Sequence, residues 1–295
     1  MESRDIWSLA AARLQDQPES SEKTLLILGE RNSGKSTLVQ LFSSASKPEA
    51  TKPTAALDYS YCRAPLGVSS KRDVGHVYEL GGGRLLADLV SVILRPELLQ
   101  STVVVLTLDL SHPHKVVDSM LFWLLKLRER TEACIAELRQ QDAKAAAKLE
   151  VKQAKQWQTH EDRKTVTPFP LPLVIVANKY DLFQNEESER KKWMARTLRY
   201  FAHKNGASLL YCSQNDQRLA APVSITQYRT VLSHFIFGGL IRKYEQSDHA
   251  QAIVMSARAD SLQSIGLAPS VRGAVSGTDD QWAKAFQELF PRPAK

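Results

Sequence analysis

Residues 29–36 form the part of this sequence most closely tied to phosphate chemistry. They read GERNSGKS, a complete match to G-x-x-x-x-G-K-[ST], between the apolar run TLLIL and the helical run KSTLVQLFSS. In this pattern backbone N–H groups converge on a phosphate at the start of a helix, the lysine adds a charge, and the hydroxyl binds Mg²⁺. The alternative is an ordinary glycine-rich turn. We expect phosphate contacts from the following residues: Gly29, Glu30, Arg31, Asn32, Ser33, Gly34, Lys35, Ser36 and Thr37.

A second motif, NKYD, ends the apolar run LVIVAN and would recognise a base. The Asp181 carboxylate can accept from both N1–H and the exocyclic amine of guanine, a pair of donors that adenine lacks in that arrangement. Asn178 would brace the loop, and the Lys179 stem would cover the base. Ser213, after the run SLLYC, would offer a backbone contact to the guanine oxygen. This order of motifs resembles Ras-like GTPases and predicts GTP or GDP as the ligand.

Two further groups would complete a magnesium site together with Ser36. Thr54 follows the phosphate motif at a distance that suits a switch threonine, which closes over Mg²⁺ and the γ-phosphate. The segment ELGGG stands where Ras-like GTPases have D-x-x-G-Q, so Glu79 takes the place of the switch aspartate. Gly82 keeps the glycine that contacts the γ-phosphate. Gly83 replaces the catalytic glutamine.

The replacement at Gly83 bears on whether this chain is an enzyme. Phosphoryl transfer in such proteins depends on orienting water and stabilising charge, and a glycine has no side chain for either task. Losing a positioned group costs on the order of 10² or more in rate. We therefore expect nucleotide binding without efficient turnover, and no catalytic residue. Two alternatives are an active GTPase switch whose partner supplies the missing groups, and an ATP-using enzyme, which NKYD disfavours.

Apolar runs alternate with helical patterns along the chain, which is typical of a parallel sheet with crossover helices. The order predicts an α/β fold, a Ras-like P-loop GTPase domain with a mostly parallel sheet flanked by helices. Continuous Val, Ile and Leu favour strands that are covered on both faces. We expect buried strands at 24–29, 103–109, 173–178 and 208–212, and more peripheral strands at 55–62 and 73–80.

We expect residues 1–295 to form one domain in several parts. An amphipathic N-terminal helix at 1–22 precedes a nucleotide-binding core at 23–240, and a C-terminal extension occupies 241–295. Between Lys115 and Val166 there is neither glycine nor proline. We interpret this stretch as one long helix or a helix pair whose distal half projects from the body. Its polar part, about 138–166, is an insertion, either a solvated helix or an arm that docks on a partner.

The extension ends in a predicted helix that begins near Thr278. Thr278 and Gln281 have the spacing of a capping box, in which each side chain accepts from the other residue's backbone N–H. The side chains of Trp282, Phe286 and Phe290, together with Leu289, then share one helical face. Packing of this face on its own domain is favoured over a partner site.

Composition excludes several classes of protein. The 39 basic and 32 acidic residues give a net charge of +7, spread along the chain without a nucleic-acid-binding motif. No apolar run reaches the roughly 18 residues of a membrane span, and no targeting segment is visible, which predicts a cytosolic protein without membrane insertion. Cys62, Cys134 and Cys212 are far apart, so we expect buried thiols in a reducing compartment.

Longer blocks of sequence resemble the dynein light intermediate chain family, in its dynein 2 branch. The blocks are DIWSLA near the start, KPTAALDYSY (52–61), ELGGG (79–83), PFPLPLVIVANKYDLFQNEESERKK (168–192), TLRYFAHKNGASLLY (197–211), SIGLAP (264–269) and LFP (289–291). Together they extend over nearly the whole chain.

The resemblance implies a non-catalytic accessory subunit of a motor. It implies binding to the dynein 2 heavy chain, to other dynein 2 subunits and to intraflagellar transport particles, with a role in retrograde transport and cilium assembly. The expected location is the cytoplasm, the cytoskeleton, and the cilium or flagellum with its basal body. The intact phosphate motif and NKYD imply a structurally bound GTP or GDP with Mg²⁺.

Overall fold

A computed structural model describes residues 22–43, 52–64, 74–213, 223–238, 245–268 and 278–293. The helix predicted at 1–22 lies outside these residues, apart from Glu22. Within the described part of the chain, no helix is long and apolar enough to cross a membrane.

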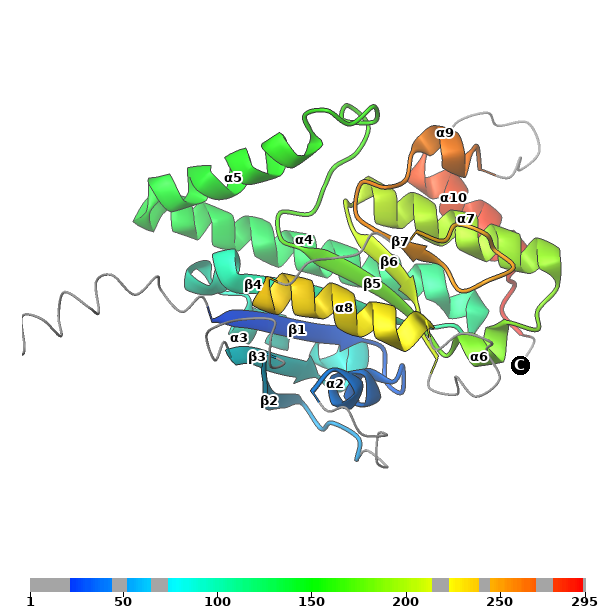
Figure 1. Cartoon of the computed structure of the whole chain (residues 1–295), viewed down its shortest axis with the longest axis horizontal. Helices are drawn as coiled ribbons and strands as arrows, with labels where there is room; N and C mark the ends of the chain where they lie inside the picture. The colour runs from blue at the N-terminus through cyan, green and yellow to red at the C-terminus, as the bar shows by residue number, and fades with distance from the viewer. Residues whose placement is uncertain are drawn as a thin grey trace, which may run out of the picture.

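A seven-stranded sheet forms the centre of the molecule (Figure 1). Its order is β2-β3-β1-β4-β5-β6-β7, with antiparallel pairing of β2 to β3 and of β6 to β7 and parallel pairing elsewhere. The predicted mostly parallel α/β sheet is confirmed. The strands are β1 (Lys23–Gly29), β2 (Leu57–Arg63), β3 (Val74–Leu80), β4 (Thr102–Asp109), β5 (Leu173–Asn178), β6 (Ser208–Tyr211) and β7 (Val254–Met255).

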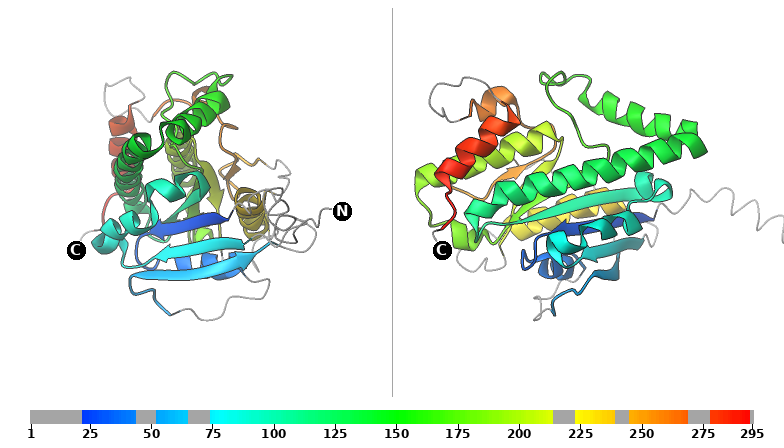
Figure 2. Two further views of the ribbon diagram at one scale, coloured as in Figure 1. Left: turned by 90° about the vertical axis from the view of Figure 1, so that its left-hand side faces the viewer. Right: turned by 180° about the vertical axis from the view of Figure 1, so that it is seen from behind.

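Helices connect these strands and cover both faces of the sheet (Figures 1 and 2). The α-helices are α2 (Lys35–Ser43), α3 (Val90–Ile93), α4 (Val116–Gln141), α5 (Ala143–Trp157), α6 (Tyr180–Phe183), α7 (Ser188–Lys204), α8 (Val223–Phe237), α9 (Leu262–Ile265) and α10 (Asp279–Leu289). Short 3₁₀ helices are η1 (Gly83–Leu89), η2 (Pro96–Ser101) and η3 (Pro113–Lys115).

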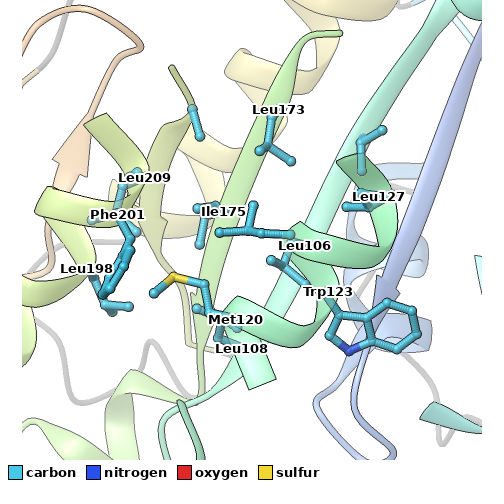
Figure 3. Close-up of a cluster of buried hydrophobic side chains, with 14 of the residues drawn as sticks. Leu106, Leu108, Met120, Trp123, Leu127, Leu173, Ile175, Leu198, Phe201 and Leu209 are labelled. Carbon is cyan, nitrogen blue, oxygen red and sulfur yellow. The ribbon is translucent and has the colours of Figure 1, made fainter. Parts of the chain in front are cut away.

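Alternate side chains of the central strands serve two separate hydrophobic cores, one on each face. On one face Leu106, Ile175 and Leu209 pack against Trp123 of α4 and Phe201 of α7 (Figure 3). On the other face α2 and α8 cover the alternate residues of the same strands. Burial on both faces explains why these strands are apolar at nearly every position.

The stretch without glycine or proline forms a helix pair, one of the two predicted arrangements. The break comes at Asp142, whose side chain accepts from the backbone N–H groups of Lys144 and Ala145 at 3.0 Å and thereby caps α5. Helix α5 then runs back along α4, with Ala146 buried against it and Trp157 buried at its end. Figures 1 and 2 show this hairpin beside the sheet.

The terminal helix α10 packs on its own domain, as expected, beside α7 (Figure 2). Trp282 stacks on Tyr200 with ring centroids 4.8 Å apart, and Phe286 is buried. The predicted capping box does not form. Thr278 occupies the N-cap position without a side-chain capping bond, because the backbone carbonyl of Thr278 already accepts from the N–H of Gln281 at 3.1 Å.

Candidate nucleotide-binding site

The phosphate motif connects β1 to α2 at the carboxyl edge of the sheet (Figure 1). Strand β1 ends at Gly29, and α2 begins at Lys35, whose ammonium group donates to the backbone carbonyls of Gly29 at 3.1 Å and Glu30 at 2.7 Å. Burial lowers the pKa of Lys35, while the carboxylates of Glu79 and Glu30 oppose that shift. The helix start and this buried ammonium place positive charge where a phosphate would bind.

The three predicted magnesium ligands meet at one point. The Ser36 hydroxyl donates to Oε1 of Glu79 at 2.7 Å, and the Thr54 hydroxyl donates to the same oxygen at 2.8 Å. The two hydroxyl oxygens lie 3.4 Å apart. Mg²⁺ prefers oxygen ligands of this kind, so the donor set fits a magnesium ion. Glu79 itself is buried, at 4% exposure.

The glycines after Glu79 make room for two loops. A Cβ on Gly81 would lie 2.3 Å from the carbonyl oxygen of Thr54, and the Gly81 N–H donates to Ala56 at 2.6 Å. Gly83 has φ +61°, and a Cβ there would lie 3.1 Å from both the backbone nitrogen of Arg31 and Oε2 of Glu30. The segment ELGGG therefore brings the switch loop and the phosphate loop together.

The NKYD motif begins at the last residue of β5, and its Asn178 contacts the phosphate loop. The Asn178 amide donates to the carbonyl of Ser33 at 2.8 Å. Lys179 adopts a left-handed backbone with φ +61°, and its ammonium donates to Asp109 at 2.7 Å. The Ser213 hydroxyl donates to Asp181 at 2.8 Å. The two sequence motifs are thus held in one structural unit.

A pocket of about 330 Å³ opens over these groups. It is lined by Arg31, Asn32, Gly34, Lys35, Ser36, Thr37, Lys52, Pro53, Thr54, Glu79, Gly81, Gly82 and Lys179. Asn178, Asp181 and Ser213 lie outside that lining, near the carboxyl ends of β5 and β6. Two buried oxygens, Asn178 Oδ1 and Ser33 Oγ, have no hydrogen-bond partner among the described residues. Buried oxygens usually find a donor, so these residues fit a site that takes a polar ligand.

Two residues of the site were missed by the sequence motifs. Asp109 ends β4 and holds Lys179; burial favours its neutral form, but Lys179 and Ser111 keep the pKa of Asp109 below its usual value. Its place at the carboxyl end of a predicted parallel strand was a usable signal. Arg84 bridges Glu30 at 2.5 Å and Asp118 at 2.8 Å, and no local pattern indicated this contact.

Known proteins are similar to this chain in sequence and in fold. A model of the dynein light intermediate chain (DLIC) family matches residues 1–169. Cytoplasmic dynein 2 light intermediate chain 1 of Bos taurus is 33% identical over 306 residues, which cover 99% of this chain and 85% of that protein. The Homo sapiens protein of that name is 32% identical over 309 residues with the same coverage.

The crystal structure of the dynein light intermediate chain's conserved domain has the same fold. It matches with a TM-score of 0.59 and 20% identity, covering 92% of each chain. The predicted fold class and the resemblance drawn from the sequence blocks are both confirmed. This chain belongs to the dynein light intermediate chain family.

Proposed function

We propose that this chain is an accessory subunit of the cytoplasmic dynein 2 motor. It binds the dynein 2 heavy chain, associates with the other dynein 2 subunits and with intraflagellar transport particles, and supports retrograde transport and cilium assembly. The supporting observation is similarity to dynein 2 light intermediate chains over 99% of this chain and 85% of their length. The corresponding location is the cytoplasm and cytoskeleton, with the cilium and its basal body.

We also propose that the domain holds GTP or GDP with Mg²⁺ as a structural ligand. The loop from Gly29 to Thr37 and Gly82 would bind phosphate, and Asn178, Lys179, Asp181 and Ser213 would bind the base. Ser36, Thr54 and Glu79 would hold the ion, which would neutralise phosphate charge. The observation that carries this proposal is the meeting of the two hydroxyls with Glu79 beside the buried Lys35.

The same geometry favours retention of nucleotide over hydrolysis. Thr54 is fastened to Glu79 by its hydroxyl, and the backbone of Ala56 is fastened to Gly81. Protein groups therefore hold the switch loop in its closed position, a task that the γ-phosphate performs in GTPase switches. Gly83 offers no group to orient water. The competing function, an active switch, requires a partner that supplies this group.

Nucleotide content tests the structural-ligand proposal. Purified protein is denatured, and the supernatant is separated by ion-exchange chromatography; we expect GDP or GTP. Asp181→Asn removes the charged acceptor for guanine, so it should lower bound guanine nucleotide at least about tenfold, because a hydrogen bond to a charged group contributes about 1.5–3 kcal/mol. The matched control Asp248→Asn changes an exposed carboxylate and should retain wild-type content. Wild-type protein without nucleotide would contradict the proposal.

Affinity purification from ciliated cells tests the motor assignment separately. Tagged full-length chain should recover a dynein 2 heavy chain in quantitative mass spectrometry, well above the tag alone. The Asp181→Asn variant tests whether this association needs nucleotide. If the nucleotide is only a structural ligand, the variant should recover less heavy chain only to the extent that less of the variant is folded. Failure to recover any dynein heavy chain would contradict the motor assignment and would not affect the nucleotide result.

A further inference from the structure

A second, larger pocket lies directly beside the phosphate pocket. It has a volume of about 750 Å³ and lies between the phosphate loop, η1, the start of α4 and the segment after α10. It shares Arg31, Asn32, Gly82 and Lys179 with the phosphate pocket. Glu30, Arg84 and Asp109, described above with the nucleotide site, also line the second pocket, whereas Lys115, Leu85 and Arg292 take no part in that site.

Positive charge predominates in this pocket. Its three carboxylates are already engaged: Arg84 bridges Glu30 and Asp118, and Lys179 binds Asp109. Arg31, Lys115 and Arg292 also line the pocket, and they form no side-chain ion pair within the described ranges. These three exposed cations are thus available to a ligand.

The positive charges near this pocket also affect His114. Its pKa is lowered by partial burial and by the nearby charges of Lys115, His112 and Arg292. These residues come from the η3 segment and from the segment that follows α10, so the cluster joins parts of the chain far apart in sequence.

Neutral donors point to the same kind of ligand. Helix α4, 26 residues long, begins at Val116 on the pocket wall, and its N-cap residue Lys115 makes no side-chain capping bond. The positive end of the helix therefore faces the pocket. Ser119 also lines the pocket; it is only 4% exposed, and its buried hydroxyl oxygen has no partner among the described residues. The dipole of α4 therefore favours an anion in this pocket.

The rim adds an apolar contact. Leu85 is 86% exposed and lines this pocket together with Pro293. A phosphate ion would use the cations but would leave the leucine uncovered, and a flat lipid surface would not enter a concave site. A short acidic segment of a partner protein, with an apolar side chain among its carboxylates, complements both the charge and the leucine.

We propose that this pocket is the docking site for such an acidic peptide segment of a partner protein. The segment lies against Leu85, with its carboxylates on Lys115, Arg292 and the start of α4. Lys115, Arg292 and Leu85 lie outside the phosphate pocket, so these contacts stay accessible to the segment when nucleotide fills that pocket.

Fluorescence anisotropy with full-length protein and a fluorescein-labelled Glu-Glu-Leu-Glu-Glu peptide tests the proposal. Saturating GDP and Mg²⁺ are present, so that the peptide does not occupy the phosphate loop. Lys115→Glu and Arg292→Glu should each weaken binding about three- to tenfold, because each replaces an attraction by a repulsion. Lys148→Glu makes the same charge change on the exposed face of α5 and should bind like wild type. Wild-type protein should bind this peptide more tightly than Glu-Glu-Ser-Glu-Glu, and Leu85→Ser should bind the two peptides equally.

Several results would overturn the proposal. Equal binding by both charge-reversed pocket variants, or equal binding of a Lys-Lys-Leu-Lys-Lys peptide, would show that the pocket does not select acidic segments. Sedimentation with phosphatidylserine vesicles that depends on Lys115 and Arg292, without peptide binding, would assign the cations to a membrane surface. Thermal melts of each variant identify loss of folding, and the Leu85→Ser result stands apart from any folding defect of the charge variants.

Discussion

The nucleotide edge and the C-terminal junction use polar side chains in different ways. The nucleotide edge is the set of loops at the carboxyl ends of β1, β3, β4 and β5. Its hydroxyls and carboxylates surround a pocket. The C-terminal junction consists of Asp162, Arg199, His203 and Asp260, where α7 meets the loop after α5 and the C-terminal extension. Its polar groups contact one another and hold these segments together.

The junction is built from buried, paired charges. Arg199 donates two hydrogen bonds of 2.7 Å to the Asp260 carboxylate, and both residues are 7% exposed. Nε2 of His203 lies 2.9 Å from Asp162, which also accepts from the backbone of Leu262 at 2.9 Å. The two regions should therefore respond differently to mutation: losses at the junction should reduce stability, and losses at the nucleotide edge should chiefly reduce ligand binding.

The largest effect is expected from Asp260→Ala at the junction. Removing one partner of a buried ion pair leaves the Arg199 guanidinium uncompensated, which costs about 3–5 kcal/mol in the free energy of unfolding. Urea denaturation followed by circular dichroism measures this change. Glu132→Ala, at an exposed position of α4, is the control and should stay within about 0.5 kcal/mol of wild type. A change of less than 1 kcal/mol for Asp260→Ala would contradict the stabilising role of the junction.

The next largest effect concerns the glycine turn at the nucleotide edge. Gly83 and Gly238 both have positive φ, +61° and +74°, but a Cβ at Gly83 meets the phosphate loop, whereas one at Gly238 has none of the described residues within 4 Å. Alanine at either position pays about 1–2 kcal/mol for the left-handed backbone. Gly83→Ala should cost more stability than Gly238→Ala, since Arg31 and Glu30 must also move. Parallel urea titrations measure the difference.

Nucleotide retention gives the same pair of variants a second readout. Because Glu30 and Arg31 are displaced in Gly83→Ala, this variant should retain less GDP after purification, whereas Gly238→Ala should keep the wild-type amount. Equal losses in both variants would mean that the contact of Gly83 with the phosphate loop does not contribute to nucleotide retention.

The proximity of the residues at the nucleotide edge was predictable because most of them belong to two short sequence patterns. Lys35 and Ser36 belong to one eight-residue pattern, and Asn178 and Asp181 belong to another. Each pattern follows a recognisable apolar strand, and parallel strands present their carboxyl ends at one edge. Proximity of the two patterns therefore followed from the fold. Thr54 and Glu79 were placed by order along the chain, and their contact with Ser36 agrees with that placement.

The junction was not predictable by the same means. His203 and Asp162 are 41 positions apart, and Arg199 and Asp260 are 61 positions apart. Nothing local distinguishes them from charges on a solvated helix face, which is the usual position of such residues. Their pairing depends on where the extension crosses α7, and that crossing is decided by long-range packing of residues such as Ile265.

The smallest of the expected effects is a pH dependence at His203. The ring is buried, and that burial lowers its pKa, although Asp162 and Asp260 oppose the shift while His160 reinforces it. With Nε2–H donating to Asp162, Nδ1 is the unprotonated nitrogen, and it has no partner among the described residues. Protonation would place an unsatisfied N–H in the core.

The sign of the effect follows from this lowered pKa. The unfolded chain binds a proton near the ordinary histidine value of about 6.5, and the folded chain binds it at lower pH. The contribution of His203 to stability is therefore complete above pH 6.5 and falls as the pH drops below it. The full loss is about 1.4 kcal/mol for each unit by which folding lowers the pKa of His203.

Urea titrations at pH 7.5 and 5.5 measure the loss of unfolding free energy on acidification. This loss should be smaller in His203→Gln than in wild type, because the glutamine can still donate to Asp162 but does not titrate. His76→Gln, at a half-buried position of β3 toward the opposite edge of the sheet, should keep the wild-type loss. An unchanged loss in His203→Gln would assign the acid sensitivity to other groups and would limit the stabilising role of the junction to the Arg199 pair.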